Sequence, residues 1–384
     1  MSVQNRWFLL AIAWCVALNL RGISIAVSPI LPLIKADLGL SFAWAGFLFA
    51  VPTVLMSLFG FPGGWLADRF GMKRTITLGL GMILAGGALR ATAPGFVSLT
   101  IWTALLGAGM GVSGPGLTRM VKDRFADLPG TATGIYTSGL VAGATLGSWL
   151  TFPYLFRWTG SWSGTFLVWS GLTLFVLLWW VFLAPSVEPS GGGPPRLSGI
   201  WRNKTVWKLN TIFLLQSLVF YSLTAWIPTY YHELGLELTT GTLILTVYII
   251  MNLPSSLFIP YLSDRVGGTK CSLIVSSLVI LPALLAMSFF PLASPWTYAV
   301  LMGLGMGGIF ALSFVLPLEY AEPGMVGSVA GANLLVGYAG TFVGPYLMGL
   351  LRDLTASFTA GWLLVAATIA ALAATAWSLP KKTV

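Results

Sequence analysis

Residues 64–73 read GWLADRFGMK and residues 260–270 read PYLSDRVGGTK, so an Asp-Arg pair followed by glycine occurs twice in the chain. Asp264 follows Asp68 by 196 positions. The same spacing relates three further pairs: Pro32 and Pro228, the LGL tripeptides at 38–40 and 234–236, and the GxGMG motifs at 107–111 and 303–307. A spacing that stays constant over half of the chain indicates a tandem duplication, and in an apolar chain two copies are typical of a membrane transporter with its site between them.

The composition of the chain is that of a membrane protein. Hydrophobic residues make up 57% of it, charged residues make up 8%, and the mean hydropathy is +0.87, whereas soluble domains carry about 25% charged residues. Apolar stretches recur along the chain, and a stretch of about 20 residues crosses the ~30 Å core of a bilayer as a helix. They are too long and continuous for barrel strands of about 10 alternating residues. We therefore expect an all-α integral membrane protein.

We expect twelve transmembrane helices in two parallel six-helix repeats. The expected spans are residues 7–29, 42–62, 75–93, 97–117, 131–153, 163–184, 207–229, 241–262, 272–290, 296–317, 326–348 and 358–379. The Gly/Pro run at 189–195 predicts a flexible cytoplasmic linker, 185–206. It separates an N-terminal bundle (1–184) from a C-terminal bundle (207–384). An even number of spans in each half gives both halves the same orientation. The first span is too long for a cleavable signal peptide.

The net charge of +9 reflects membrane topology rather than nucleic-acid binding. With both termini in the cytoplasm, fifteen of the 20 Lys and Arg residues fall in cytoplasmic segments and three in outside loops, which leaves Arg21 and Arg90 within spans. This positive-inside bias fixes the orientation and predicts a multi-pass protein of the plasma (inner) membrane. Cys15 and Cys271 offer neither a disulfide framework nor the spacing of metal ligands.

The segment 64–74 resembles the signature of the major facilitator superfamily, G-x-L-a-D-r-x-G-r-k between spans two and three. A degenerate second copy surrounds Asp264, and the resemblance covers the whole chain. It implies the major facilitator fold and an alternating-access transporter. Three shorter stretches resemble the branch of cyanate permeases and nitroimidazole transporters: Asn19-Leu20-Arg21, Ala88-Leu89-Arg90 and Val121-Lys122-Asp123-Arg124-Phe125.

The two Asp-Arg loops are predicted to form a conformational latch, a role that rests largely on the superfamily resemblance. An Asp at a helix end can pair with a basic group on a neighbouring helix in one state of the cycle only, and such a contact biases the equilibrium between states. Gly71 and Gly267 supply the positive φ that tight turns need. The predicted latch residues are Gly64, Asp68, Arg69, Gly71, Lys73, Arg74, Asp264 and Arg265. The alternative is a charged turn that only sets the topology.

Arg21 is the strongest candidate for substrate binding. It lies about two thirds of the way along the first expected span, where a cation is costly and the headgroups are distant. No Asp or Glu falls within an expected span, so the sequence offers Arg21 no intramembrane carboxylate. The fork of guanidinium donors suits a small anion. The alternative is that backbone carbonyls or an acid at a span end satisfy this side chain.

Aromatic and neutral polar residues are predicted to complete the site. Trp14 shares a helix face with Arg21, whereas Asn19 lies about 200° around the helix, where an interhelical hydrogen bond is the favoured role. The other candidates are Ser113, Tyr136, Gln216, Tyr221, Tyr248, Asn252, Asn333 and Tyr338. For each of these alone, helix packing is the alternative. Arg90 lies close to Pro94, and snorkelling to the interface is the favoured interpretation for its side chain.

The sequence predicts an alternating-access secondary transporter of a small anion, with cyanate or a similar monovalent anion as the substrate. The first alternative is the efflux of a neutral or weakly acidic organic compound, nitroaromatic or drug-like. The second is a membrane sensor that binds a ligand without moving it. No nucleophile–base set, metal cluster or phosphate loop supports an enzyme, and no cofactor is expected. The expected partners are an anionic small molecule and the lipid bilayer, without nucleic acid, and we expect a monomer.

Overall fold

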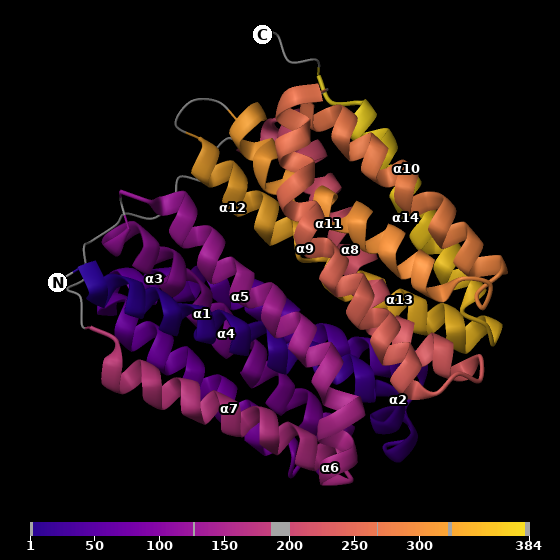
Figure 1. Ribbon diagram of the computed structural model, residues 1–384, viewed down its shortest axis with the longest axis horizontal. Coiled ribbons are helices and arrows are strands. Elements are labelled where there is room, and N and C mark those ends of the chain that lie inside the picture. The colour runs from indigo at the N-terminus through magenta and orange to yellow at the C-terminus, as the bar shows by residue number, and fades with distance from the viewer. Residues whose placement is uncertain (1–2, 126, 186–199, 267, 322–324, 381–384) are drawn as a thin grey trace. The chain divides into compact units, whose positions relative to one another are not determined.

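The computed structural model describes residues 3–125, 127–185, 200–266, 268–321 and 325–380 (Figure 1). Those residues form helices and their connections, with no β-strand. They pack as two compact units, one of residues 1–40 and 51–194 and the other of residues 41–50 and 195–384. The expectation of an all-α fold is confirmed.

The helices follow one another with short connections. The first unit holds α1 (Val3–Ile25), α2 (Val27–Asp37), most of α3 (Phe42–Arg90), α4 (Phe96–Arg124), α5 (Pro129–Leu150), a π-helical turn (Thr151–Phe156), α6 (Arg157–Thr159) and α7 (Trp162–Leu183). The second holds a short 3-10 turn (Ile200–Arg202), α8 (Lys204–Glu233), α9 (Leu238–Val266), α10 (Gly268–Phe289), α11 (Pro295–Tyr320), α12 (Val326–Gly337), α13 (Gly340–Thr355) and α14 (Thr359–Trp377).

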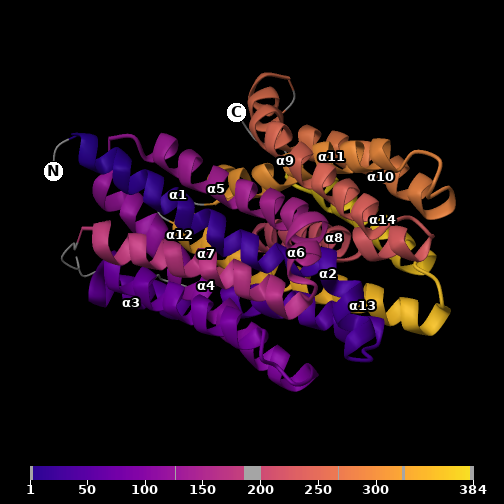
Figure 2. The ribbon, with the colours of Figure 1, turned by 60° about the horizontal axis from the view of Figure 1, so that its bottom comes forward.

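Ten helical segments within the described residues are long and apolar enough to cross a membrane. One of them, α3, is 49 residues long and contains Gly71 at φ 81° and ψ 163°. It therefore consists of two successive helices that meet at a sharp kink, and each corresponds to one expected span. The 22-residue α5, which is not one of those ten segments, lies beside α1 and corresponds to the expected fifth span (Figure 2). Together they make the twelve expected transmembrane helices.

The first span is longer than the sequence predicts. Instead of ending near residue 29, it runs from Arg6 to Asp37 through α1 and α2, with one irregular residue at Ala26. Pro29 suggests a helix end, but it lies in the first turn of α2, where its missing N–H is not needed. The expected end of this span was therefore wrong by about two turns.

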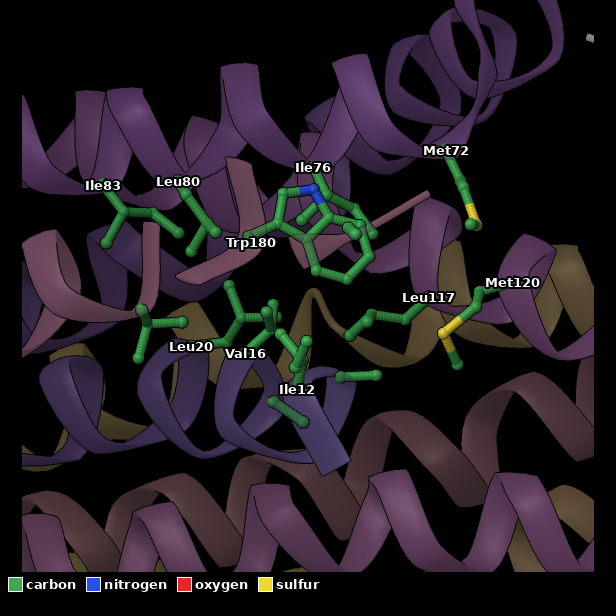
Figure 3. Close-up of a cluster of buried hydrophobic side chains, with 14 of the residues drawn as sticks. Ile12, Val16, Leu20, Met72, Ile76, Leu80, Ile83, Leu117, Met120 and Trp180 are labelled. Carbon is green, nitrogen blue, oxygen red and sulfur yellow. The ribbon is translucent and has the colours of Figure 1, made fainter. Parts of the chain in front are cut away.

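The core of the first unit is a buried apolar cluster formed mainly by α1, α3, α4 and α7. Figure 3 shows Ile12, Val16 and Leu20 of α1 facing Ile76, Leu80 and Ile83 of α3, with Trp180 of α7 between them and Leu117 and Met120 of α4 beside them. The Trp180 ring is fully buried, and its Nε1 donates to the Lys73 carbonyl at 3.1 Å. These contacts bring α1, α3, α4 and α7 together along the length of the unit.

The duplication is visible in the packing of glycines. A Cβ added to Gly107 would lie 2.4 Å from the carbonyl oxygen of Pro52, and one added to Gly303 would lie 2.5 Å from that of Tyr248. Tyr248 follows Pro52 by the same 196 positions that separate the two glycines. Equivalent backbones therefore touch in both units, and only glycine permits this approach.

Residues 41–50, at the start of α3, belong to the first repeat by sequence but pack with the second unit. Asp353 accepts hydrogen bonds from the backbone N–H groups of Phe42 and Ala43, at 2.9 and 2.8 Å, and so caps the N-terminus of α3. Gly46 lies against the carbonyl of Pro345. Residues 186–199 of the predicted linker lie outside the described residues, so the linker remains a prediction.

Candidate functional site

The Asp68 loop is tied to α4 by charge. Asp68 forms an ion pair with Arg119, and the same guanidinium donates from Nε to Asp123 at 2.8 Å. Only 10% of the Arg119 side chain is exposed, against 40% of Asp68 and 18% of Asp123, so water screens the contact with Asp123 less than the contact with Asp68. Asp68 is thus paired with a basic group on a neighbouring helix, while its role in a latch stays a prediction. Arg119 is not among the predicted latch residues, although its i,i+4 spacing to Asp123 is a recognisable signal.

The second loop does not repeat this charge network. Asp264 and Arg265 are exposed, and the Arg265 guanidinium lies over the Tyr261 ring at 4.5 Å. The position equivalent to Arg119 is Val315. Glu319, equivalent to Asp123, instead accepts a hydrogen bond from the Thr269 hydroxyl at 2.8 Å. The second copy therefore keeps the turn without the arginine that ties the first copy to its neighbour.

The remaining predicted latch residues surround the turns. Gly71 has the expected positive φ, Gly267 lies outside the described residues, and the following Gly268 has φ 74°. Arg69 is exposed, with its guanidinium 5.2 Å from the Trp65 ring and 5.5 Å from the Phe70 ring. The other members are half-buried Gly64 and Lys73 and exposed Arg74. Their role in a latch remains a prediction.

Arg21 lies close to the middle of the first span. It is 15 residues from Arg6 and 16 from Asp37, the two ends of that 32-residue segment, so about 23 Å of helix separates it from either end. The side chain is half-buried and takes part in an interaction within the structure. The absence of an acid from the expected spans therefore does not leave this cation isolated, and its position in the span is the stronger argument for a role.

Two other candidates on α1 hold it to neighbouring helices. Trp14 donates from Nε1 to the Ser138 hydroxyl of α5 at 3.0 Å. The amide Nδ2 of buried Asn19 donates to the Thr173 hydroxyl of α7 at 3.0 Å, which confirms the predicted interhelical hydrogen bond. Trp14 lies seven residues and Asn19 two residues before Arg21, so polar bonds to α5 and to α7 as well as the apolar face position this part of α1.

Ser113 and Tyr136 complete the candidates of the first unit. The buried Ser113 hydroxyl donates to the Gly109 carbonyl of its own helix at 3.0 Å. It also lies so close to Gly79 of α3 that a Cβ on that glycine would overlap it. Tyr136 of α5 is half-buried against the apolar cluster. For Ser113 the contacts are those of helix packing, the alternative stated for it.

The candidates of the second unit lie on α8, α9 and α12. Gln216 and Tyr221 are buried on α8, where the Tyr221 ring lies 6.4 Å from that of Phe49 at the start of α3. Tyr248 is fully buried on α9, and one turn later Asn252 donates from Nδ2 to the Tyr248 carbonyl at 2.6 Å. All four residues lie on neighbouring helices of one unit. Tyr221 and Asn252 are already engaged in packing contacts.

Asn333 lies within α12, and Tyr338 is the residue that follows its last turn. Asn333 is buried and donates from Nδ2 to the Ser313 carbonyl of α11 at 3.0 Å, and its Oδ1 has no acceptor or donor partner among the described residues. The Tyr338 ring packs against Phe213 at 5.5 Å. Asn333 thus retains hydrogen-bonding capacity, whereas the Tyr338 ring serves to join α12 to α8.

Arg90 contradicts its predicted role. Its side chain is 0% exposed, so it does not snorkel to an interface. The guanidinium carbon lies 4.2 Å from the centre of the Phe166 ring, on α7. Pro94, four residues after Arg90, indicates that this helix ends close to the membrane surface. The Phe166 ring of α7 nevertheless lies against the Arg90 side chain, and no local sequence pattern reveals such a contact between helices. Among the described residues no three His, Cys, Asp or Glu side chains gather as a metal site.

Comparison with known proteins gives relatives that span nearly the whole chain. The chain is 30% identical to the uncharacterized transporter YycB of Bacillus subtilis, over 93% of this chain and 89% of that protein. It is 26% identical to the cyanate transport protein CynX of Escherichia coli, over 90% of each. It is 28% identical to the 2-nitroimidazole transporter of Escherichia coli, over 92% of this chain and 90% of that protein. The branch that the sequence resembles is therefore confirmed among its relatives.

The fold agrees with these relatives. A solved structure of the nucleoside transporter NupG matches with a TM-score of 0.81 at 14% identity, over 97% of this chain and 100% of that chain. Residues 9–345 match the Major Facilitator Superfamily. Since fold and relatives are those of transporters, the prediction that this multi-pass membrane protein is not an enzyme is confirmed. The chain belongs to the major facilitator superfamily.

Proposed function

We propose that the protein is an alternating-access secondary transporter of a small monovalent anion, cyanate or one like it, and that Arg21 attracts the anion. The observation that carries the proposal is the position of Arg21, midway along a 32-residue membrane span. A cation at that depth is costly unless it has a function or partners. A guanidinium offers several donors in one plane, and planar donors suit a small linear or trigonal anion.

The surroundings of Arg21 supply the second part of the argument. Trp14, two turns earlier on the same face of α1, has its Nε1 occupied by Ser138, so its ring presents an apolar wall rather than a competing donor. We propose in addition that neutral candidates of the second unit, Asn252 and Asn333 among them, contribute hydrogen bonds without adding charge. Similarity to a cyanate transport protein supports the same substrate class.

The transport cycle is proposed to rock the two six-helix repeats about the site, with the Asp68 loop as the latch. The ion pair of Asp68 with Arg119 gives the latch a contact that can form and break. We further propose a monomer in the inner membrane with both termini in the cytoplasm, on the strength of the positive-inside charge bias.

The orientation has a direct test in a native cysteine. Cys271 is exposed at the start of α10, whereas Cys15 is half-buried. If the termini are cytoplasmic, a membrane-impermeant maleimide should leave Cys271 unlabelled in intact cells and label it in inverted vesicles. Labelling of Cys271 in intact cells at the rate seen in inverted vesicles would contradict the proposed orientation. A Cys271→Ser variant is the control for labelling at Cys15.

The substrate proposal is tested by uptake into liposomes that contain the purified protein. Cyanate, nitrate, formate and a neutral solute are offered to the native protein and to Arg21→Ala. We expect uptake of a monovalent anion that falls at least tenfold in Arg21→Ala, because a charged hydrogen bond contributes about 1.5–3 kcal/mol. Arg157→Ala, which removes an exposed cation, is the matched control. Undiminished uptake by Arg21→Ala would refute the anion role.

A second candidate is the efflux of a nitroaromatic or other weakly polar compound, which similarity to a 2-nitroimidazole transporter favours. Such a ligand would depend on aromatic walls such as Trp14 and should tolerate the loss of Arg21. Transport of 2-nitroimidazole that survives in Arg21→Ala but falls in Trp14→Ala would favour this candidate. Transport that falls in Arg21→Ala but survives in Trp14→Ala would favour the anion transporter.

A further inference from the structure

Arg90 has a different environment from the other arginines whose contacts are described. Arg119 has two carboxylates and Arg352 has Glu233 at 3.0 Å. Arg90 is 0% exposed, and its Nε, Nη1 and Nη2 have no acceptor among the described residues. A buried guanidinium that keeps all of its N–H groups unpaired is strongly unfavourable. The native fold must therefore compensate this charge by something other than a side chain of the first unit.

The ring of Phe166 offsets only part of the cost. The guanidinium carbon lies 4.2 Å from the centre of this ring, a cation–π contact. A cation–π contact contributes modestly to stability, and here it leaves the N–H donors of the guanidinium without an oxygen or nitrogen acceptor in the part of the chain that the structure describes. Ser170 lies one turn after Phe166 on α7, and its hydroxyl donates to the Phe166 carbonyl at 2.7 Å rather than accepting a hydrogen bond from Arg90.

Close helix packing keeps the side chain from leaving this position. One turn before Arg90, a Cβ on Gly87 would lie 2.7 Å from the Ser170 hydroxyl of α7 and 3.0 Å from Ile23 of α1. The three helices α1, α3 and α7 therefore meet without space for a long side chain to pass between them. The Arg90 guanidinium is therefore held inside the unit, and a species that neutralises it must bind there.

We propose that Arg90 forms an anion site of its own within the first unit, which holds a small monovalent inorganic anion of the chloride type. One negative charge neutralises the guanidinium, whereas a divalent oxyanion would leave one charge buried and would lose more hydration energy on entry. The N–H donors of one guanidinium, unpaired within the described residues, suit a small anion that accepts several hydrogen bonds from one side. The site is separate from Arg21, which lies on α1 and has interactions of its own.

The duplication allows us to predict how many anions each chain binds at this kind of site. The residue equivalent to Arg90 in the second repeat is Ala286. The second unit therefore lacks the cation at this place, and we expect one such anion for each chain. The inference does not rest on the transported substrate, since an anion that stabilises the fold need not cross the membrane.

The test is thermal unfolding of the purified protein in sodium chloride, bromide or nitrate, compared with sodium gluconate or sulfate at equal ionic strength. We expect a midpoint that rises with chloride concentration and saturates, as binding to the folded state alone requires. Arg90→Met keeps the length of the side chain and removes the charge, and it should abolish the chloride dependence. Arg157→Met, which removes an exposed charge from the same unit, should keep it.

The Arg21→Met variant separates this site from the transport site. Chloride dependence retained in Arg21→Met and lost in Arg90→Met supports the proposal. Dependence lost in Arg21→Met but retained in Arg90→Met overturns it while leaving the anion transport proposal standing. If Arg90→Met does not fold, crystals of the native protein grown in bromide decide: an anomalous peak beside the Arg90 guanidinium supports the site, and its absence there overturns it.

Discussion

The two repeats share their packing and differ in their charge. Gly107 against Pro52 in the first unit and Gly303 against Tyr248 in the second make the same backbone contact, 196 residues apart. The charged positions show no such agreement. Arg119, which ties the first loop to α4, has Val315 as its equivalent. Arg21 and Arg90 correspond to Ser217 and Ala286.

This difference teaches which features the fold requires and which it permits to diverge. Close approach of two helices depends on a glycine and any backbone carbonyl, so Pro52 could be replaced by Tyr248 without loss of the contact. A buried arginine imposes a cost that only a partner or a ligand can offset. Because all of these arginines lie in the first repeat, we attribute the proposed anion specificity to that repeat.

The largest difference between the repeats is expected at their loops. Asp68→Asn removes a carboxylate from a guanidinium of which only 10% is exposed, whereas Asp264→Asn alters an exposed side chain with no described ion pair. We expect the first substitution to reduce the uptake rate in liposomes at least tenfold and the second less than twofold. Equal losses in both variants would show that the loops act alike and that the Arg119 contact is not the basis of their role.

The second prediction concerns the feature that the repeats share. Gly107→Ala and Gly303→Ala should each destabilise the protein by about 1–3 kcal/mol, because the added methyl group meets backbone that cannot rotate away. Chemical unfolding of the purified variants measures this. Gly81→Ala is the control, since nothing lies within 4 Å of its Cβ and alanine favours helix there. A lower free energy of unfolding in only one of the two variants would contradict the prediction that the repeats share this packing contact.

The smallest effect is expected at the surface of the first unit. Hydrogen bonds from Arg6 Nη1, at 3.0 and 2.9 Å, lower the pKa of the Asp127 carboxyl below its ordinary value. Because the folded pKa is depressed, the contribution is complete above the unfolded value of about 4 and is lost as the pH falls through the folded value. Asp127→Asn should shift the midpoint of thermal unfolding by no more than about 1 °C at neutral pH.

The pH dependence of that small shift is its check. The difference between the native protein and Asp127→Asn should stay constant from pH 7 to pH 5 and vanish in stronger acid. A difference that increases as the pH falls would contradict the depressed pKa, since it would require a carboxyl that is stabilised in its protonated form.

Much of the fold could be predicted because membrane helices follow from composition and length. The 196-residue spacing and the glycine motifs gave the two repeats, and the break at Gly71 was expected from its turn. The end of the first span was missed because Pro29 is tolerated at a helix start. The packing of residues 41–50 with the second unit was missed because Asp353, 310 residues from Ala43, provides the helix cap. Such contacts depend on tertiary structure alone.

The candidate site was less predictable than the fold. Residue type and helical position sufficed for the hydrogen bond of Asn19 and for the pairing of Asp68. They failed for Arg90, because its distance from Pro94 in sequence says nothing about the ring of Phe166 that covers it. They also left Ser113 as a site candidate, although its hydroxyl is held by the carbonyl one turn before it. Side-chain partners on other helices decide these cases.

The central claim is that the first repeat recognises an anion through Arg21, and equilibrium binding of radiolabelled cyanate to the purified protein tests it most directly. The comparison is between the native protein and Arg21→Ser, which gives the first repeat the residue that the second has at Ser217. We predict saturable binding by the native protein and an affinity at least tenfold weaker in the variant, in keeping with the loss of about 1.5–3 kcal/mol from a charged hydrogen bond. Equal affinity in the two proteins would contradict the claim.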